Sequence, residues 1–102
     1  MAPAPSAANA ASPAQSAALF LEHCAICHGE IGDGHGPRRG SLFRKPPDFR
    51  DLGWRAGKTL PELRAIIRDG RRGTDMPPWR TLGEPAIAGL AEHVLWLGEA
   101  LR

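Results

Sequence analysis

Five consecutive residues, Cys24-Ala25-Ile26-Cys27-His28, have the types and spacing of a haem attachment site. A Cys-x-x-Cys-His run is typical of c-type haem binding. Positions three apart lie on one face of a helical turn, so the two thiols can each form a thioether with a vinyl group on one porphyrin edge. His28 follows directly and can place its imidazole under the ring as an iron ligand. The chain has 2 cysteines, and both belong to this motif.

The same cysteine pair permits other chemistry. A thioredoxin-like dithiol centre needs a βαβ context, and no segment of this sequence alternates like a strand. Structural zinc needs four Cys/His ligands at characteristic spacings, whereas His23, His35 and His93 form no His-x3–5-His pair. A structural disulfide across so short a loop would stabilise little. We therefore predict covalent haem, with zinc binding and dithiol chemistry as the alternatives.

The composition suits one small domain that packs around a cofactor. The chain has 102 residues, of which 42% are hydrophobic, with 3 Trp and 3 Phe. Many of the remaining hydrophobic residues are alanines, and a domain of this size buries a thin core. A covalently held haem would add a large apolar disc on which these side chains can pack.

Basic residues gather in the middle of the chain. They outnumber acidic residues within 38–80, whereas 1–37 and 81–102 are net acidic, and the formal net charge is +2. The basic stretch has no recognisable nucleic-acid motif and is interrupted by Pro and Asp, so we do not expect nucleic acid as a partner. We expect instead a partly solvated basic face that steers an acidic protein partner.

Residues 1–12 are mostly Ala and Pro and are predicted to form a flexible leader or linker before a domain at 13–102. This segment lacks the basic and leucine-rich regions of a signal peptide. No stretch of the chain is long and apolar enough to span a membrane. Because thioether haem is assembled outside the cytoplasm, we expect a periplasmic or otherwise extracytoplasmic protein. Its export signal is not in this chain, which suggests a mature form or a domain of a larger protein.

Helical patterns dominate the rest of the sequence. Ser12-Pro13-Ala14-Gln15 has the capping-box pattern and predicts a helix that runs into Cys24. A second helix is predicted over 60–69, between the cap Thr59 and Gly70, and a third over 84–100. The residues expected to be buried on these two helices are Leu63, Ile66, Ile67, Ile87, Leu90, Val94 and Leu97. Residues 29–58 are rich in turn formers and predict a loop that wraps the cofactor.

Taken in order, these pieces resemble a class I c-type cytochrome of the monohaem, His/Met-ligated kind, over residues 12–101. The resemblance rests on the helix that ends in the 24–29 motif, a 32–37 glycine-rich loop, the 73–79 segment and the amphipathic C-terminal helix. It implies an all-α cytochrome c fold, with about three to four helices and long loops around one covalent haem c.

Met76 is the candidate for the second axial ligand, with His28 as the first. The protein has 2 methionines, and the other starts the chain. A thioether sulfur is a soft ligand that favours reduced iron, so a His/Met pair raises the reduction potential. Pro77 and Pro78 are expected to stiffen the ligand loop. The alternative is a methionine that fills a gap in the core.

Other site residues follow from the resemblance. Pro37 resembles the proline whose carbonyl accepts the Nδ1–H of the proximal imidazole, here His28, with a plain turn proline as the alternative. The candidates for the haem edge and its propionates are Trp54, Trp79, Arg38 and Arg39.

The resemblance also implies a crossing of the first and last helices. Phe20 matches the aromatic residue of the first helix, and Ser16 stands where Gly is usual. Leu90 and His93 stand where Leu and Tyr often occur on the last helix, so His93 is expected at the helix interface. His23 and His35 are expected to be solvated residues in a loop or at a helix end.

An iron whose two axial positions are filled by protein has no vacant site for a small-molecule substrate. The expected function is therefore one-electron transfer between redox partner proteins, without enzyme activity of its own, through small, wet interfaces. The alternative is a haem relay domain or subunit of a larger periplasmic oxidoreductase. Less favoured is a gas-binding or peroxidatic haem protein in which Met76 does not ligate.

Overall fold

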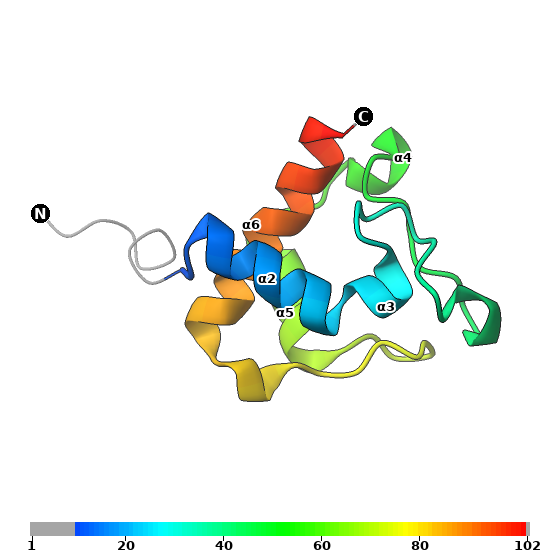
Figure 1. The fold of residues 1–102 in the computed structure, drawn as a ribbon, viewed down its shortest axis with the longest axis horizontal. Helices are drawn as coiled ribbons and strands as arrows, with labels where there is room; N and C mark the ends of the chain where they lie inside the picture. The colour runs from blue at the N-terminus through cyan, green and yellow to red at the C-terminus, as the bar shows by residue number, and fades with distance from the viewer. Residues whose placement is uncertain (1–9, 102) are drawn as a thin grey trace, which may run out of the picture.

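The structure is a computed structural model that describes residues 10–101 (Figure 1). Its elements are α2 (Pro13–His23), α3 (Ala25–His28), η1 (Arg39–Ser41), α4 (Leu52–Arg55), α5 (Leu60–Asp69), η2 (Arg80–Leu82) and α6 (Glu84–Ala100). The described part of the chain contains no strand, so the predicted all-α fold is confirmed. Helices α2 and α5 both pack on α6, while α3 and the long connections lie to one side.

Helix α2 begins at the predicted capping box. The Oγ of Ser12 accepts a hydrogen bond from the Gln15 backbone N–H at 3.1 Å, and the Gln15 side chain accepts one from the Ser12 N–H at 2.9 Å. The backbone N–H of Ala11 donates to the Pro85 carbonyl at 2.8 Å. The last residues of the predicted leader are therefore attached to the domain, and residues 1–9 of that leader lie outside the described residues.

Helices α2 and α6 cross where two small residues meet. Ser16 on α2 is 2% exposed, and a Cβ built on Gly89 of α6 would overlap its hydroxyl group. The crossing continues through Phe20, whose ring centroid lies 5.1 Å from that of His93. This confirms the predicted interface position of His93. The glycine at the crossing lies on the last helix, which the sequence analysis did not anticipate.

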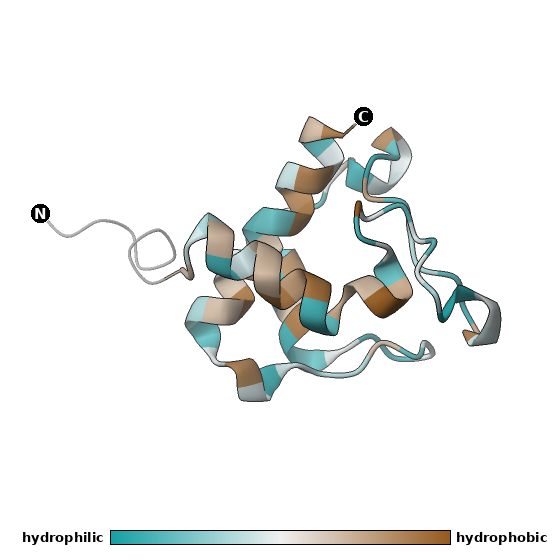
Figure 2. Ribbon diagram, in the orientation of Figure 1, coloured by the Kyte–Doolittle hydropathy of each residue, from teal (hydrophilic) through white to brown (hydrophobic). Residues whose placement is uncertain are grey.

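The predicted boundaries of α5 and α6 agree with the structure. The Thr59 hydroxyl accepts from the Glu62 N–H at 3.2 Å, and α5 ends at Gly70, whose φ of 73° is the left-handed conformation that glycine tolerates. The expected core positions on these helices are buried, apart from Ile66, which is half-buried. Figure 2 shows hydrophobic positions on the packed helices and more hydrophilic long connections. No helix within residues 10–101 is long and apolar enough to cross a membrane.

The 29–58 segment contains more structure than the predicted loop. It includes the short elements η1 and α4. Before this segment, the helix that was predicted to run into Cys24 ends at His23, and α3 forms a separate turn. These one-turn elements explain why residues 10–101 hold five α-helices where about three to four were expected. Sustained periodicity cannot detect a helix of 4 residues.

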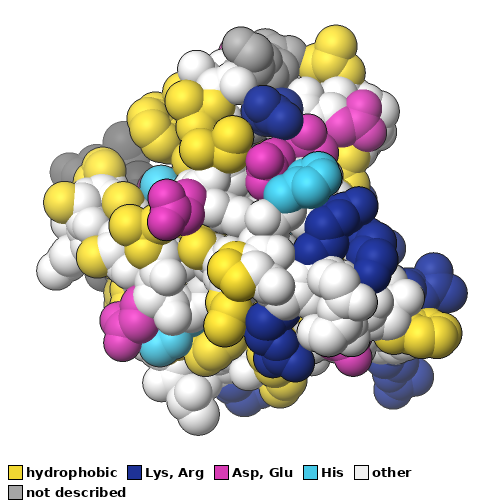
Figure 3. All heavy atoms as spheres, turned by 45° about the vertical axis from the view of Figure 1, so that its right-hand side comes forward, with side chains coloured by type: hydrophobic (Ala, Val, Ile, Leu, Met, Phe, Trp, Pro, Cys, Tyr) yellow, Lys and Arg dark blue, Asp and Glu magenta, His cyan; other side chains and the backbone are white. Residues whose placement is uncertain are grey.

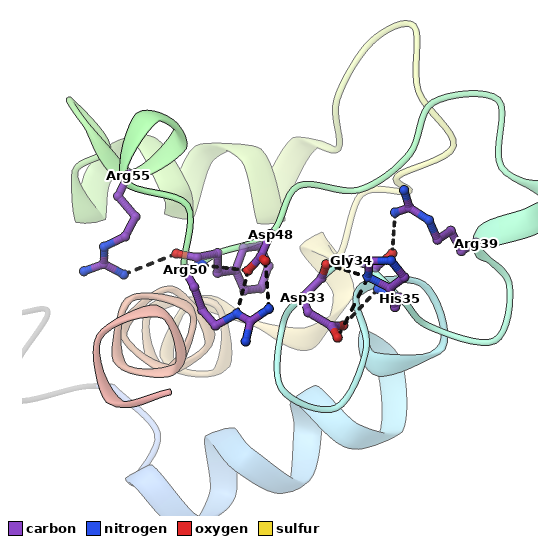
Figure 4. Close-up of polar contacts among 8 residues, drawn as sticks. Asp33, Gly34, His35, Arg39, Asp48, Arg50 and Arg55 are labelled. Carbon is purple, nitrogen blue, oxygen red and sulfur yellow. Dashed lines mark hydrogen bonds and ion pairs between the residues drawn. The ribbon is translucent and has the colours of Figure 1, made fainter. Parts of the chain in front are cut away.

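Phe49 anchors this segment in the core. Its side chain is 3% exposed, and its backbone N–H donates to the Gly32 carbonyl at 2.8 Å. On either side of it in the sequence, Asp48 and Arg50 form a paired ion contact at 2.9 Å (Figure 4). Arg55 then donates to the Leu95 carbonyl of α6 at 3.1 Å. The burial of Phe49 and the bond from Arg55 therefore hold the later part of this segment against the core and α6.

Candidate haem site

A cavity of about 490 Å³ lies between α3, the 42–47 loop, the 54–58 segment and the 71–79 segment. Its walls include Cys24, Cys27, His28 and Met76. The fold thus brings the attachment motif and the predicted second ligand to one cavity, although they lie in distant parts of the sequence. The volume is within the usual range for a cofactor pocket, about 300–1,000 Å³.

His28 ends α3 and presents its ring to this cavity. The imidazole stacks on the phenyl ring of Phe49, with centroids 5.2 Å apart and an angle of 29° between the planes. Burial lowers the pKa of His28 from 6.5 to about 4. The ring is therefore neutral at pH 7, which is the form that binds a metal.

The hydrogen bond expected between His28 and Pro37 is not formed. The Nδ1 atom of His28 is buried, and no acceptor among residues 10–101 takes its proton. The residues on either side of Pro37 are instead bonded to α3 through their backbones. The Gly36 N–H donates to the Cys27 carbonyl at 3.2 Å, and the Arg38 N–H donates to the Ile26 carbonyl at 2.8 Å. Pro37 itself is exposed and lies between these two contacts, so its position is that of a residue in a fixed turn.

The chemistry of the cysteines does not favour a dithiol centre. Cys24 and Cys27 are both free. Burial, and to a lesser degree the neighbouring Cys27, raises the pKa of Cys24 to about 12. Reactive dithiol sites require the opposite shift, towards thiolate at neutral pH. The zinc alternative gains no support either, because the described residues contain no group of three or more metal-binding His, Cys, Asp or Glu side chains.

Met76 lies in a segment that is fixed mainly through its backbone. The Met76 N–H donates to the Thr74 hydroxyl at 3.2 Å, and that hydroxyl donates to the Arg71 carbonyl at 2.7 Å. Further along, the Trp79 N–H donates to the Ile67 carbonyl of α5 at 2.9 Å. The Met76 side chain is partly buried against the core and lines the cavity.

The structure separates the other predicted cofactor contacts into two groups. Trp54 and Trp79 line the cavity, whereas Arg38 and Arg39 do not. Arg38 is exposed, and the guanidinium of Arg39 donates to the Gly34 carbonyl at 2.8 Å (Figure 4). These two arginines therefore do not line the cavity, and only Arg39 has a side-chain partner in its own loop.

Different cations line the cavity. They are Arg44, Lys45, Lys58 and Arg71, together with one acidic residue, Asp75. All belong to the basic stretch seen in the sequence, but no local spacing distinguishes them from the other basic residues there. Figure 3 shows Lys and Arg side chains gathered towards one side of the molecular face that it presents.

The remaining histidines occupy different surroundings. His23 is half-buried at the end of α2, the helix-end position expected for it, and it lines the cavity and packs on Trp79 with ring centroids 4.9 Å apart. His35 is exposed, as predicted, and its backbone N–H donates to the Asp33 carboxylate at 2.9 Å (Figure 4). His93 lies at the α2–α6 interface and does not line the cavity.

The sequence matches a known protein family over most of its length. The family of cytochrome c oxidase, cbb3-type, subunit III matches residues 11–94. The chain belongs to this family. The cbb3-type cytochrome c oxidase subunit CcoP of Cereibacter sphaeroides is 33% identical to it over 91 residues, which is 88% of this chain. The same subunit of an Azospirillum species is 31% identical over 93 residues, or 90% of this chain. This subunit III-family chain spans only 29% and 31% of the lengths of these curated relatives.

Solved structures with the same fold include c-type cytochromes. One chain of the Kuenenia stuttgartiensis reducing HAO-like protein complex superposes with a TM-score of 0.71 at 27% identity, over 85% of this chain and 43% of that one. The KustC0563 c-type cytochrome gives a TM-score of 0.65 at 25% identity, over 80% of this chain and 95% of that one. The subunit III-family chain is therefore a cytochrome c-type domain.

The residues on the cavity walls fit a haem. The two thiols can form the thioethers of a c-type haem, and a neutral imidazole and a soft thioether are ligands that its iron can accept. The buried Nδ1 of His28 has no hydrogen-bond partner among residues 10–101, and an imidazole bound to iron through Nε2 would carry its proton at this Nδ1. Two indole rings supply apolar contact, and the cations can face the carboxylates of the porphyrin.

Proposed function

We propose that this chain is a one-electron transfer domain that holds a single haem c. In this proposal Cys24 and Cys27 form the two thioethers, and His28 and Met76 are the axial ligands. The observation that carries the proposal is the single cavity whose walls contain all four residues. The family of the chain supports it, because its relatives are described as cytochrome c oxidase subunits.

When bound, the haem supplies a reversible one-electron couple at its iron. The residues of the chain determine how that couple behaves. The neutral imidazole of His28 can donate its Nε2 lone pair, and Phe49 holds the ring at a fixed tilt. The sulfur of Met76 favours the reduced state and thereby raises the potential. Trp54 and Trp79 exclude water from the cavity walls.

The cations at the cavity suit contact with acidic surfaces. We propose that Arg44, Lys45, Lys58 and Arg71 offset the porphyrin carboxylates and attract redox partner proteins with acidic docking surfaces. Because the curated relatives are oxidase subunits of which this chain covers about a third, a relay role within a larger extracytoplasmic oxidoreductase is favoured over a free-standing carrier. In either case the domain passes electrons and performs no catalysis of its own.

The deciding experiment is expression together with the haem-attachment machinery of a bacterial periplasm. We expect a red protein with one haem per chain by mass spectrometry, retained after acid-acetone extraction. Cys24→Ser and Cys27→Ser should each leave a single thioether or lose the haem. Extraction that strips all haem from the unmodified protein would contradict covalent attachment. Carbon monoxide binding to the reduced unmodified protein would instead favour a gas-binding or peroxidatic protein.

A further inference from the structure

The two loops that border the cavity are joined by one long-range hydrogen bond. The Oδ2 atom of Asp75 accepts from the backbone N–H of Phe43 at 2.7 Å, across 32 positions of sequence. Leu42 and Arg44, on either side of Phe43, line the cavity, as do Asp75 and Met76. The bond therefore closes a ring of chain around part of the cavity. The contact is exposed to solvent, and it is a charge-assisted bond, which is stronger than a bond between two neutral groups.

Asp75 is the single acidic residue on the described walls, which also include Arg44, Lys45, Lys58 and Arg71. In these surroundings a carboxylate would be expected to pair with a cation. Among the described ion pairs, however, none involves Asp75, and its carboxylate accepts its hydrogen bond from the amide of Phe43. The geometry of the contact therefore indicates that Asp75 holds two loops together and does not serve mainly to balance charge.

The loop that Asp75 reaches is itself anchored. The side chain of Leu42 is 7% exposed, and the ammonium group of Lys45 donates to the carbonyls of Arg39 and Leu42 at 2.8 and 3.2 Å. The side chain of Phe43, by contrast, is 81% exposed, so it adds little packing of its own. The position of the Phe43 backbone amide is therefore fixed by the contacts of Leu42 and Lys45 and not by the Phe43 side chain.

We propose that Asp75 is a positioning residue that keeps the sulfur of Met76 inside the cavity by tying the 74–76 segment to the 42–45 loop. Thr74 secures the same segment from within its own loop, since its hydroxyl accepts from the Met76 N–H at 3.2 Å. Asp75 supplies the attachment across the cavity. Without it, the 74–76 segment keeps its local bonds, the Trp79–Ile67 bond beyond it and the packing of Met76 on the core, but it loses its attachment to the 42–45 loop. This inference rests on the proposed ligation of the haem by Met76.

The test uses the haem-loaded protein and exogenous imidazole, which binds ferric iron only where Met76 has been displaced. Asp75→Ala should bind imidazole about tenfold more tightly than the parent, which corresponds to about 1.4 kcal/mol. Asp75→Asn keeps an oxygen acceptor and should stay close to the parent. Glu92→Ala is the charge control, because Glu92 is an exposed acid on α6 that does not line the cavity; it should leave imidazole affinity unchanged.

The same bond can be removed from its other end. Phe43→Pro deletes the donor N–H, and Leu42 before it has φ −84° and ψ 136°, a conformation that a following proline accepts. Phe43→Pro should match Asp75→Ala, whereas Phe43→Ala retains the N–H and should match the parent. Since both changes break one bond, the double variant should bind imidazole no more tightly than either single variant.

Hydrogen exchange at the Phe43 amide gives a readout that does not depend on the sixth ligand. We expect this amide to exchange at least about tenfold faster in Asp75→Ala than in the parent. If the parent lacks sulfur–iron coordination, the proposed ligand set fails, and the exchange measurement still tests the contact. Unchanged exchange and imidazole affinity in Asp75→Ala would overturn the inference. So would an Asp75→Asn variant that behaves like Asp75→Ala, since the charge and not the hydrogen bond would then be responsible.

Discussion

The imidazole of His28 and the phenyl ring of Phe49 are stacked, with centroids 5.2 Å apart and planes inclined by 29°. Phe49 also contacts Phe20 edge-on at 6.3 Å and Trp54 at 5.1 Å. Phe49 therefore contacts the proposed iron ligand His28, Phe20 at the crossing of α2 and α6, and Trp54 on the cavity wall. The orientation of His28 depends on core packing as well as on its own helix.

Phe49→Ala should therefore weaken the fold and the support of His28 together. Truncation of a buried phenylalanine costs about 3–5 kcal/mol, and Phe49 is 3% exposed. The free energy of unfolding from denaturant titration of the haem-loaded protein checks this. Phe43→Ala is the matched control, since that phenylalanine is 81% exposed and its loss should cost no more than about 0.5 kcal/mol. Equal losses in the two variants would contradict the role given to Phe49.

Met76→Ala should change the iron without releasing the haem. We expect the weak far-red band of sulfur–iron coordination to disappear and the potential to fall, because a harder ligand favours ferric iron. The variant should remain red, since Cys24 and Cys27 are intact. Spectra and redox titration measure both effects. If both match the parent, the sixth ligand lies elsewhere, and His23 is the first candidate because it lines the same cavity.

Electron exchange with an acidic partner should slow as salt increases. Exposed charges are screened within about 10 Å at 0.1 M ionic strength, and Arg44 and Arg71 are exposed residues at the cavity. Arg44→Ala and Arg71→Ala should each lower the association rate and flatten its salt dependence in stopped-flow measurements. Arg38→Ala, an exposed arginine away from the cavity, should have a smaller effect. If the association rate does not change or increases with salt concentration, the basic residues do not steer the partner and form only a solvated surface.

Gly89→Ala should strain the helix crossing, because the added Cβ would overlap the Ser16 hydroxyl. Overpacking of this kind typically costs about 1–3 kcal/mol. Ser16→Gly in the same protein should recover part of that loss, since the remaining neighbours of the Cβ, both from Ala11, are at 3.1 Å. Thermal unfolding of the two single variants and the double variant tests the coupling. Additive losses would mean that the two residues are not in contact.

The ion pair between Arg68 and Glu84 should make part of the stability depend on pH. Arg68 donates to both Glu84 oxygens, at 2.9 and 2.6 Å, and this hydrogen bonding lowers the pKa of Glu84 below 4.5. A carboxylate with a lowered pKa stabilises the fold above its unfolded pKa and loses that contribution as the pH falls through the lowered value.

Arg68→Met should therefore destabilise the protein at neutral pH and match the parent in strong acid. Denaturant unfolding of the two proteins at several pH values gives the difference. Arg72→Met, at an exposed arginine, provides the control for loss of charge alone. A difference that is constant with pH would show that packing of the arginine stem, not the ion pair, stabilises the junction of α5 and α6.

The sequence by itself determined the features that depend on residues close together in the chain. The Cys24 to His28 motif, the capping box at Ser12, the cap at Thr59 and the burial pattern of α6 each involve side chains within about one or two helical turns. For that reason the fold class and the bounds of the three longer helices were predictable. Met76 was named by resemblance, and its side chain lines the same cavity as the attachment motif.

Only the tertiary structure decided which distant residues meet. The choice of Arg71 over Arg38 at the cavity, the packing of His23 on Trp79 and the bond from Asp75 to Phe43 all join separate loops. Loops without periodicity carry no local signal of where they lie. Their paths are set by a few buried anchors, and those anchors act only once the helices have assembled around them.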